Sequence, residues 1–537
     1  MLSLKAVNCQ SADTLAQEQV TAPSKEKVLD ALGEVAAKLR GKLGESLATV
    51  QKFDVPLADD TTPSLEALKE WSLGRKVFRE KGPPKALPYL ERAVQLDPHF
   101  AMVYVEMGAV YSSLGELERS GQYYTKAFRL SEHVSEREKL TIAAHYYGYV
   151  TGELNKAAQV YEEEIANYPR LAATYGNLSI VYDELGQSER AAEMIRQDLL
   201  LAPDNVAPYA LMAAYDEELQ HFDEARQIIQ EAQARKLDVY LMHNTLYTLA
   251  FLSSDSTAMA EQQQWYVGKP EEYMGLSLAS DTEAYAGHLS KARELTKQSV
   301  GSAIRNDSKE NGAIWWENAA LREAAFGNTT EALKAATEGS KLASASQGVG
   351  VEVALALAIA GDIERAEGLA RDLNKRYPLD TQMQSLWLPA IQAQLALDRK
   401  TPALALNALQ AASRIELGSI GSSPKRPASI MSTYVERPTW LVHKAAQPPP
   451  SSRRFSTIAA SWETAGREHW RVWAWRVPMR CSREPRREQM LMPPASVRSP
   501  PTKTSSPFGK TPTPRHPRPE ASQSRVREIA VSRSGQQ

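Results

Sequence analysis

Apolar and polar positions follow the spacing of paired amphipathic helices from about residue 61 to residue 415. When segments are aligned on their prolines, this pattern recurs about every 34 residues. Small residues such as Gly108 and Ala191 stand where two helices of a pair would touch. Pro169 and Pro203 should end second helices, because proline disfavours helical geometry in the residue before it. The pattern predicts an all-α array of roughly eight to ten antiparallel helix pairs.

The repeats resemble the tetratricopeptide repeat family. The segment "KAAQVYEEEIANYP" ends one unit, and "FGNTTEALKAA" matches the turn and second helix of a later one. The match is specific from about Ser64 to Ala234 and weaker from there to about residue 415. The resemblance implies an α-solenoid, a superhelix of antiparallel helix pairs. His145 and Glu164 depart from it, since they occupy positions where the family has small residues.

The first sixty residues have a different pattern. "LSLKAVNCQSADTLAQEQVTA" predicts two strands joined by a turn at "CQSAD". A helix follows with Val28, Leu32, Val35 and Leu39 on one face. A two-stranded hairpin with one helix is a poor independent core, so we expect a partial α/β unit whose domain begins before Met1.

Two further segments are "NCQSADTLAQEQVTAPSKEKVLDALGEVAAKLRGKLGESLATVQKFDVPL" and "TTPSLEALKEWSLGRK". Through these segments, residues 1–420 resemble the C-terminal half of bacterial serine/threonine protein kinases that contain tetratricopeptide repeats. This resemblance implies a signalling role next to a kinase domain and, in many members, a membrane helix. The kinase glycine-rich loop, His-Arg-Asp and Asp-Phe-Gly motifs do not occur in this sequence. We therefore expect no enzymatic activity, no catalytic residue and no cofactor in this chain.

Charge separates the chain into two kinds of sequence. From Gly421 onward there are 21 Lys and Arg against 7 Glu and no Asp, a net charge of +14, which leaves −16 for the rest of the total of −2. Cys9 and Cys481 are too few for a disulfide framework or a zinc site. No segment approaches the roughly 20 apolar residues of a membrane span, so the default expectation is a cytoplasmic protein. We divide the chain into 1–60 (partial sensor-like α/β unit and linker), 61–234 (well-formed repeats), 235–415 (degenerate repeats) and 416–537 (Arg/Pro-rich tail).

The concave face of a solenoid, lined by the first helix of each repeat, is the expected binding surface. Aromatic and acidic residues predominate there and suggest a protein or peptide partner that is basic or apolar. Some members of the family clamp a C-terminal carboxylate, but only one residue of this face, an asparagine, fits such a clamp. The alternative is that the acidic side chains only keep an exposed helix face in contact with water, and that the tyrosines are packing residues rather than ligand contacts. The candidate peptide-binding residues are Tyr146, Tyr149, Asn177, Ile180, Asp183, Glu217 and Glu218.

The tail permits two interpretations. Enrichment in Pro and Arg is typical of a disordered basic extension, and such a tail could bind nucleic acid through phosphate contacts. The other interpretation is translation one base out of frame. "SRRFSTIAA" can be encoded by codons that read "FQKILDHRG" in the neighbouring frame, and three further windows also acquire helical spacing. We favour the frameshift, which makes nucleic-acid binding the weaker hypothesis.

The frameshift hypothesis predicts that insertion or deletion of a single base near codons 418–432 restores an open reading frame. Sequencing this stretch of the gene is the measurement. A restored frame without helical apolar spacing would contradict the hypothesis.

Overall fold

The computed structural model describes residues 1–8, 11–24, 27–44, 61–410, 412 and 415. The predictions for residues 416–537, namely disorder, nucleic-acid binding and a shifted frame, lie outside these residues. Most of the expected linker between the N-terminal unit and the repeats, residues 45–60, also lies outside them.

The N-terminal segment forms the predicted hairpin and helix. Strand β1 (Leu2–Val7) pairs antiparallel with β2 (Thr14–Val20), with Leu2 opposite Val20. Helix α1 (Val28–Lys42) packs on the sheet because Val35 and Leu39 are buried in one small cluster with Leu4.

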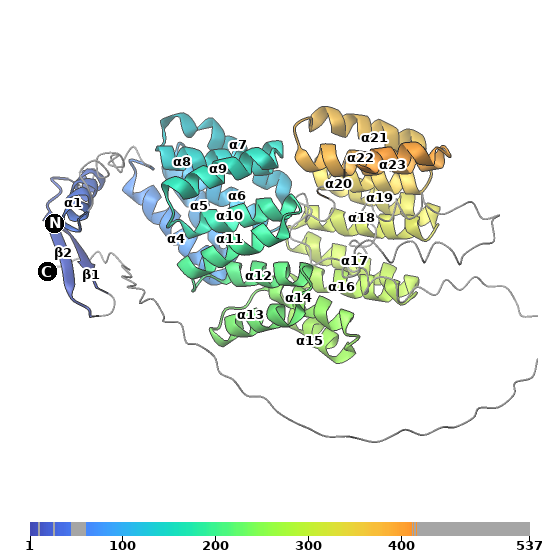
Figure 1. Ribbon diagram of the computed structural model, residues 1–537, viewed down its shortest axis with the longest axis horizontal. Coiled ribbons are helices and arrows are strands. Elements are labelled where there is room, and N and C mark those ends of the chain that lie inside the picture. The colour runs from blue at the N-terminus through green and yellow to red at the C-terminus, as the bar shows by residue number, and fades with distance from the viewer. Residues whose placement is uncertain (9–10, 25–26, 45–60, 411, 413–414, 416–537) are drawn as a thin grey trace, which may run out of the picture. The chain divides into compact units, whose positions relative to one another are not determined.

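The described residues from 65 to 410 fold into ten consecutive helix pairs, at the upper end of the predicted range. The two members of each pair lie side by side in Figure 1. The predicted all-α solenoid of antiparallel helix pairs is confirmed. The pairs are α4 (Leu65–Lys81) with α5 (Pro83–Leu96), α6 (Ala101–Ser113) with α7 (Leu117–Arg129), α8 (Glu136–Tyr146) with α9 (Leu154–Asn167), α10 (Ala172–Glu184) with α11 (Ser188–Leu201), α12 (Val206–Glu218) with α13 (Phe222–Ala234), α14 (Tyr240–Leu252) with α15 (Ser256–Tyr266), α16 (Glu272–Tyr285) with α17 (Leu289–Arg305), α18 (Lys309–Ala325) with α19 (Thr329–Leu342), α20 (Gln347–Ile359) with α21 (Ile363–Arg376), and α22 (Leu388–Asp398) with α23 (Pro402–Gln410). Three short turns interrupt them: η1 (Ser131–His133) and the π-helical η2 (Tyr147–Thr151) and η3 (Met383–Trp387).

Small residues allow the two helices of a pair to approach closely. A Cβ atom at Gly108 of α6 would lie 2.7 Å from a ring carbon of Tyr124 on α7, so only glycine fits without a shift. On the second helices, Ala191 and Ala225 are fully buried at the corresponding contacts.

The prolines end the second helices as predicted, and each also anchors the next repeat. Helices α5, α9 and α11 each end two residues before a proline. The carbonyl oxygen of that proline then accepts a hydrogen bond from a tyrosine six residues later, a contact that ties the end of one pair to the start of the next. The three bonds are Tyr104 to Pro98 (3.0 Å), Tyr175 to Pro169 (3.1 Å) and Tyr209 to Pro203 (3.1 Å).

The turn inside each pair requires one residue with a positive φ. Gly186 has φ 74° after α10, and its N–H and the next N–H donate back to the end of that helix. Gln220 takes the same conformation after α12, with φ 63° and the same pair of backbone hydrogen bonds. Ser254 after α14 and Lys400 after α22 also have a positive φ, so several turns keep this geometry without a glycine.

The two departures from the family pattern are accommodated by polar contacts. His145 is 5% exposed, and its Nδ1 lies 2.7 Å from the carbonyl oxygen of Thr141; burial lowers the pKa of the imidazole to about 4. Glu164 is 2% exposed and accepts hydrogen bonds from the hydroxyls of Thr141 and Thr174. Burial raises the pKa of this carboxyl group.

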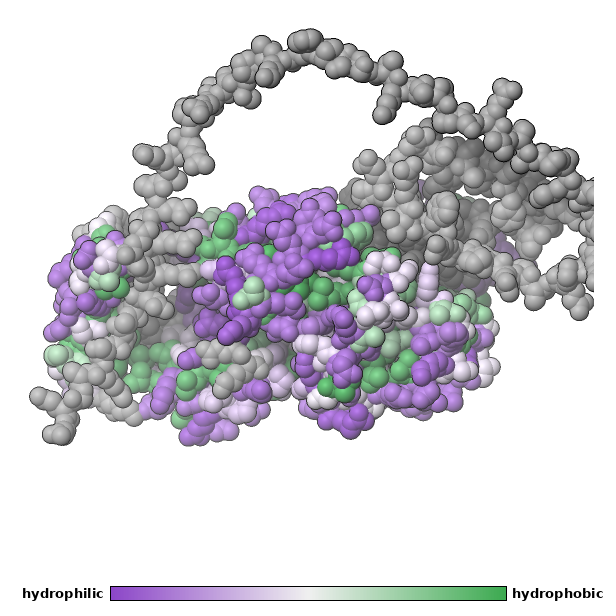
Figure 2. All heavy atoms as spheres, turned by 90° about the horizontal axis from the view of Figure 1, so that it is seen from below, coloured by the Kyte–Doolittle hydropathy of each residue, from purple (hydrophilic) through white to green (hydrophobic). Residues whose placement is uncertain are grey.

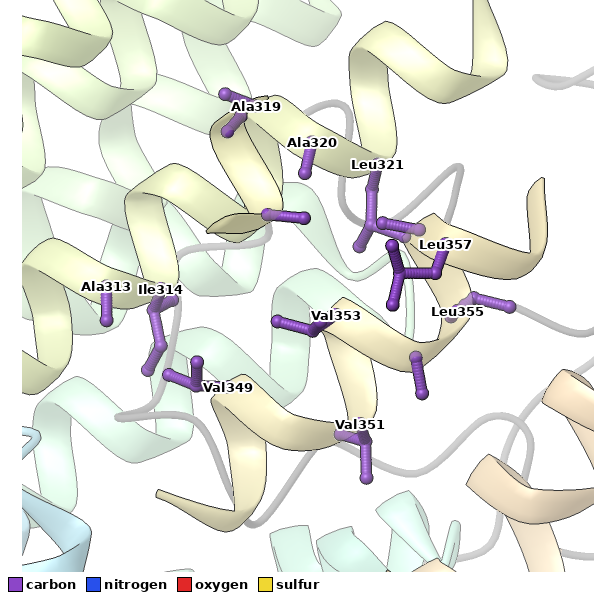
Figure 3. Packing of buried hydrophobic residues seen from close by; sticks show 14 of the residues in the cluster. Ala313, Ile314, Ala319, Ala320, Leu321, Val349, Val351, Val353, Leu355 and Leu357 are labelled. Atoms are coloured by element: carbon purple, nitrogen blue, oxygen red, sulfur yellow. The ribbon is translucent and has the colours of Figure 1, made fainter. Parts of the chain in front are cut away.

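The largest hydrophobic cluster lies around α18 and α20. Figure 3 shows Ile314 and Leu321 of α18 near Val349, Val353 and Leu357 of α20. An ion pair between Arg322 and Asp281, both 2% exposed, joins α18 to α16 at 3.0 Å. Much of α18 is therefore buried along its length.

The outer surface is predominantly polar where it is visible. Figure 2 shows hydrophilic residues over much of one face, with hydrophobic residues in narrower strips between them. Within the part of the chain that the structure describes, no helix combines the length and hydropathy needed to cross a bilayer.

We expect Gln220→Gly to raise the free energy of unfolding by about 1 kcal/mol, because the left-handed conformation is strained by about that amount in a non-glycine residue. Urea unfolding followed by circular dichroism measures the change. The matched control is Gln230→Gly in the exposed middle of α13, which should destabilise by about 1 kcal/mol because glycine disfavours a helix. A loss of stability at both positions would contradict the argument.

Candidate functional site

A cavity of about 750 Å³ lies between helix pairs that are distant in sequence. One wall consists of α7 and η2, and the other of the start of α20 and the residues around η3. Helix α7 contributes a stripe at helical spacing, since residues 118, 122, 125 and 129 lie on one face of a helix. The cavity is therefore a product of tertiary structure rather than of one repeat.

Acidic side chains outnumber basic ones on the cavity. The four acids are Glu118, Glu184, Glu310 and Asp380, and the two bases are Lys126 and Arg129. Burial raises the pKa of Glu310 and of Asp380. Both carboxylates already accept hydrogen bonds from the protein, Asp380 from the side chain of Gln347 at 2.8 Å and Glu310 from a serine hydroxyl at 2.6 Å.

Three aromatic residues, Tyr149, Tyr377 and Trp387, also line the cavity. Trp387 is 1% exposed, and its indole Nε1 has no hydrogen-bond partner among the described residues. Tyr149 is half-buried, and burial raises the pKa of its hydroxyl. A buried donor without an acceptor costs free energy.

The structure brings one of the sequence-predicted binding residues, Tyr149, to this cavity. Tyr146 instead stacks on Phe128 with ring centroids 4.0 Å apart. Asn177 lies beside His145, with its Nδ2 3.5 Å from Nε2 of the imidazole.

The other four candidates lie on α10 and α12. Ile180 is half-buried and packs against the core of the third to fifth pairs, and Asp183 is 2% exposed. Glu217 is half-buried, and burial raises the pKa of its carboxyl group to about 8, although a hydrogen bond with Thr245 opposes this shift. Glu218 is exposed.

Sequence reasoning missed the α7 stripe and the residues around η3. The stripe has a weak signal in the spacing of Glu118, Gln122 and Arg129, which are exposed polar residues on one face. Asp380 and Trp387 have no such signal, because nothing local indicates that they line the same cavity as α7. Within the described residues no cluster of three or more His, Cys, Asp or Glu could hold a metal ion.

Comparison with known proteins supports the repeat architecture. Residues 102–133 match the tetratricopeptide repeat model, whereas a comparison with curated proteins finds no match. Among solved structures, MamA residues 41 to the end from Desulfovibrio magneticus is 17% identical, covering 32% of this chain and 96% of MamA, with a TM-score of 0.22. PilF from Pseudomonas aeruginosa is 18% identical over 38% of this chain and 95% of its own, with a TM-score of 0.26. Yeast Tom70 is 14% identical, covering 71% of this chain and 97% of Tom70, with a TM-score of 0.35.

The succession of paired helices, the small residues at their contacts and the matched unit lead to one conclusion about the architecture. The helical region of this chain is a tetratricopeptide-repeat α-solenoid.

Proposed function

We propose that the chain is a non-catalytic protein-interaction module that captures a peptide or protein segment in the cavity between α7 and η3. The observation behind this proposal is the cavity itself, which has a volume of about 750 Å³ and is lined by aromatic and acidic residues contributed by distant helix pairs.

The charge of the cavity favours a basic or apolar segment. Four of the residues that line it are acidic and two are basic. Tyr149, which is half-buried, offers part of its ring to an aliphatic or cationic side chain. Lys126 is engaged over the ring of Tyr104, 4.4 Å from its centroid, which reduces its availability to an acidic ligand.

We expect peptides rich in Lys, Arg and Leu to bind the full-length chain, and peptides rich in Asp and Glu not to bind. Glu118 is exposed on the cavity wall, so Glu118→Lys should weaken binding about tenfold by replacing attraction with repulsion. Fluorescence anisotropy with labelled peptides of these two compositions measures the effect.

The matched control is Glu132→Lys, which makes the same charge change on an exposed residue of η1 that does not line the cavity. It should leave the affinity unchanged. Equal weakening by both variants would contradict the cavity as the site. Binding of acidic peptides would contradict the proposed charge preference, and binding of neither class would contradict the function.

A more specific part of the proposal is that the chain acts together with a protein kinase. The segment "NCQSADTLAQEQVTAPSKEK" and the repeats behind it resemble bacterial serine/threonine kinases with tetratricopeptide repeats. In this proposal the repeats act in the cytoplasm and recruit partners for such a kinase. We therefore expect a kinase reading frame next to this gene. Sequencing the DNA upstream of Met1 is the test. If no kinase reading frame were found there, only this part of the proposal would be contradicted.

A further inference from the structure

The N-termini of α7 and α18 cap each other. Glu116 precedes α7, and its Oε1 accepts a hydrogen bond from the backbone N–H of Glu310 at 3.1 Å. Glu310 lies in the first turn of α18, and its Oε2 accepts from the backbone N–H of Glu118 at 3.0 Å. The first N–H groups of a helix lack partners within it, so each carboxyl group satisfies a donor of the other helix. The two acids are 194 residues apart in sequence.

Further polar contacts surround this reciprocal cap, which we call the Glu116–Glu310 clasp. Two of them join the turn after α6 and the start of α7 to the start of α18, one joins the end of α6 to α14, and one joins Glu310 to the residue before α20. The contacts are the ion pair of Arg119 with Asp307 (2.9 Å) and hydrogen bonds from Asn311 to the carbonyl of Leu114 (2.7 Å), from Tyr240 to the carbonyl of Ser113 (3.3 Å) and from Ser346 to Glu310 (2.6 Å).

A second set of contacts lies on another part of the cavity wall. The N–H of Thr381 donates to the carbonyl of Gly152 at 2.8 Å, and the hydroxyl of Thr381 accepts from the N–H of Leu154 at 3.1 Å. The side chain of Gln382 donates to the carbonyl of Glu184 at 3.0 Å. Residues of both sets line the cavity, so its two walls are held together at these contacts.

We propose that the Glu116–Glu310 clasp assembles the cavity, and that ionisation of its two buried carboxyl groups releases it. The use of the cavity by a peptide rests on the function proposed above, whereas the opening and closing of its walls does not.

Two opposing effects act on the ionisation of Glu116 and Glu310. Both acids are 4% exposed, which penalises their charged forms, while the positive ends of two helices favour those forms. Burial and the neighbouring Glu310 raise the pKa of Glu116 to about 7, and burial raises that of Glu310. The other titratable groups facing the pair are Glu118 and Arg119 on α7, Asp307 and Lys309 at α18, and Tyr273 on α16.

The sign of the pH effect follows from these shifts. Once the clasp opens, Glu116 returns to an ordinary pKa near 4.5, so the closed form binds the proton more tightly. The stability that protonation gives to the closed form is fully present below about pH 4.5 and is lost as the pH rises through about 7. The cavity should therefore be assembled in mildly acidic solution and come apart in mildly alkaline solution.

The test measures, with no ligand present, the distance between η1, which follows α7, and α19, which is paired with α18. Spin labels are attached at Glu132→Cys and Thr330→Cys, both exposed, in the full chain with Cys9 and Cys481 replaced by Ser. In this parent we expect one short, narrow distance distribution at about pH 5.5 and a longer, broader one at about pH 8.5.

Two double variants separate capping from charge. Glu116→Gln with Glu310→Gln keeps an amide oxygen as acceptor and removes the charge, so the short distance should persist at both pH values. Glu116→Ala with Glu310→Ala removes both acceptors, so the long distance should appear at both. Circular dichroism establishes that each variant retains its helices.

Two results would overturn the proposal: an alanine variant with the same distances as the parent, or a glutamine variant that keeps the parent's pH response. A pH-dependent distance without any peptide binding would refute the proposed function and leave the clasp intact.

Discussion

The close approach of the two helices within each pair is the constraint on which the rest of the structure depends. At Gly108 even a methyl group would collide with the ring of Tyr124, and the fully buried Ala191 and Ala225 make similar contacts in later pairs. Because the helices are this close, the turn between them must reverse within a few residues. That reversal requires one residue in the left-handed conformation, which is a glycine at Gly186 and a glutamine at Gln220.

Where a large or polar residue replaces a small one, hydrogen bonds replace close packing. His145 and Glu164 are both buried, and each is oriented by the backbone or the hydroxyl of Thr141. The same solution recurs on α18, where buried Arg322 pairs with Asp281. A buried polar group that loses its hydrogen-bond or ion-pair partner destabilises the fold, so these contacts tolerate little change.

Sequence alone predicts what depends on local spacing. The helix pairs, their proline ends and the N-terminal hairpin all follow from apolar periodicity and turn residues within a few dozen positions. The cavity depends on contacts between residues nearly two hundred positions apart, as Glu116 and Glu310 illustrate. Seven candidate residues were predicted on a concave face, and only Tyr149 of these lines the cavity, because local spacing cannot show that α7 and η3 border the same cavity.

These long-range contacts also change how the array responds to perturbation. In a simple solenoid each repeat contacts its neighbours, so stability is approximately a sum of local terms. Here the second pair also contacts the eighth through Arg119 and Asp307, and the third contacts the tenth through Gly152 and Thr381. Loss of order in one pair therefore removes contacts from a pair far along the chain. A change at one wall of the cavity is thus transmitted to the other without passing through the intervening repeats, which allows the array to act as one cooperative unit.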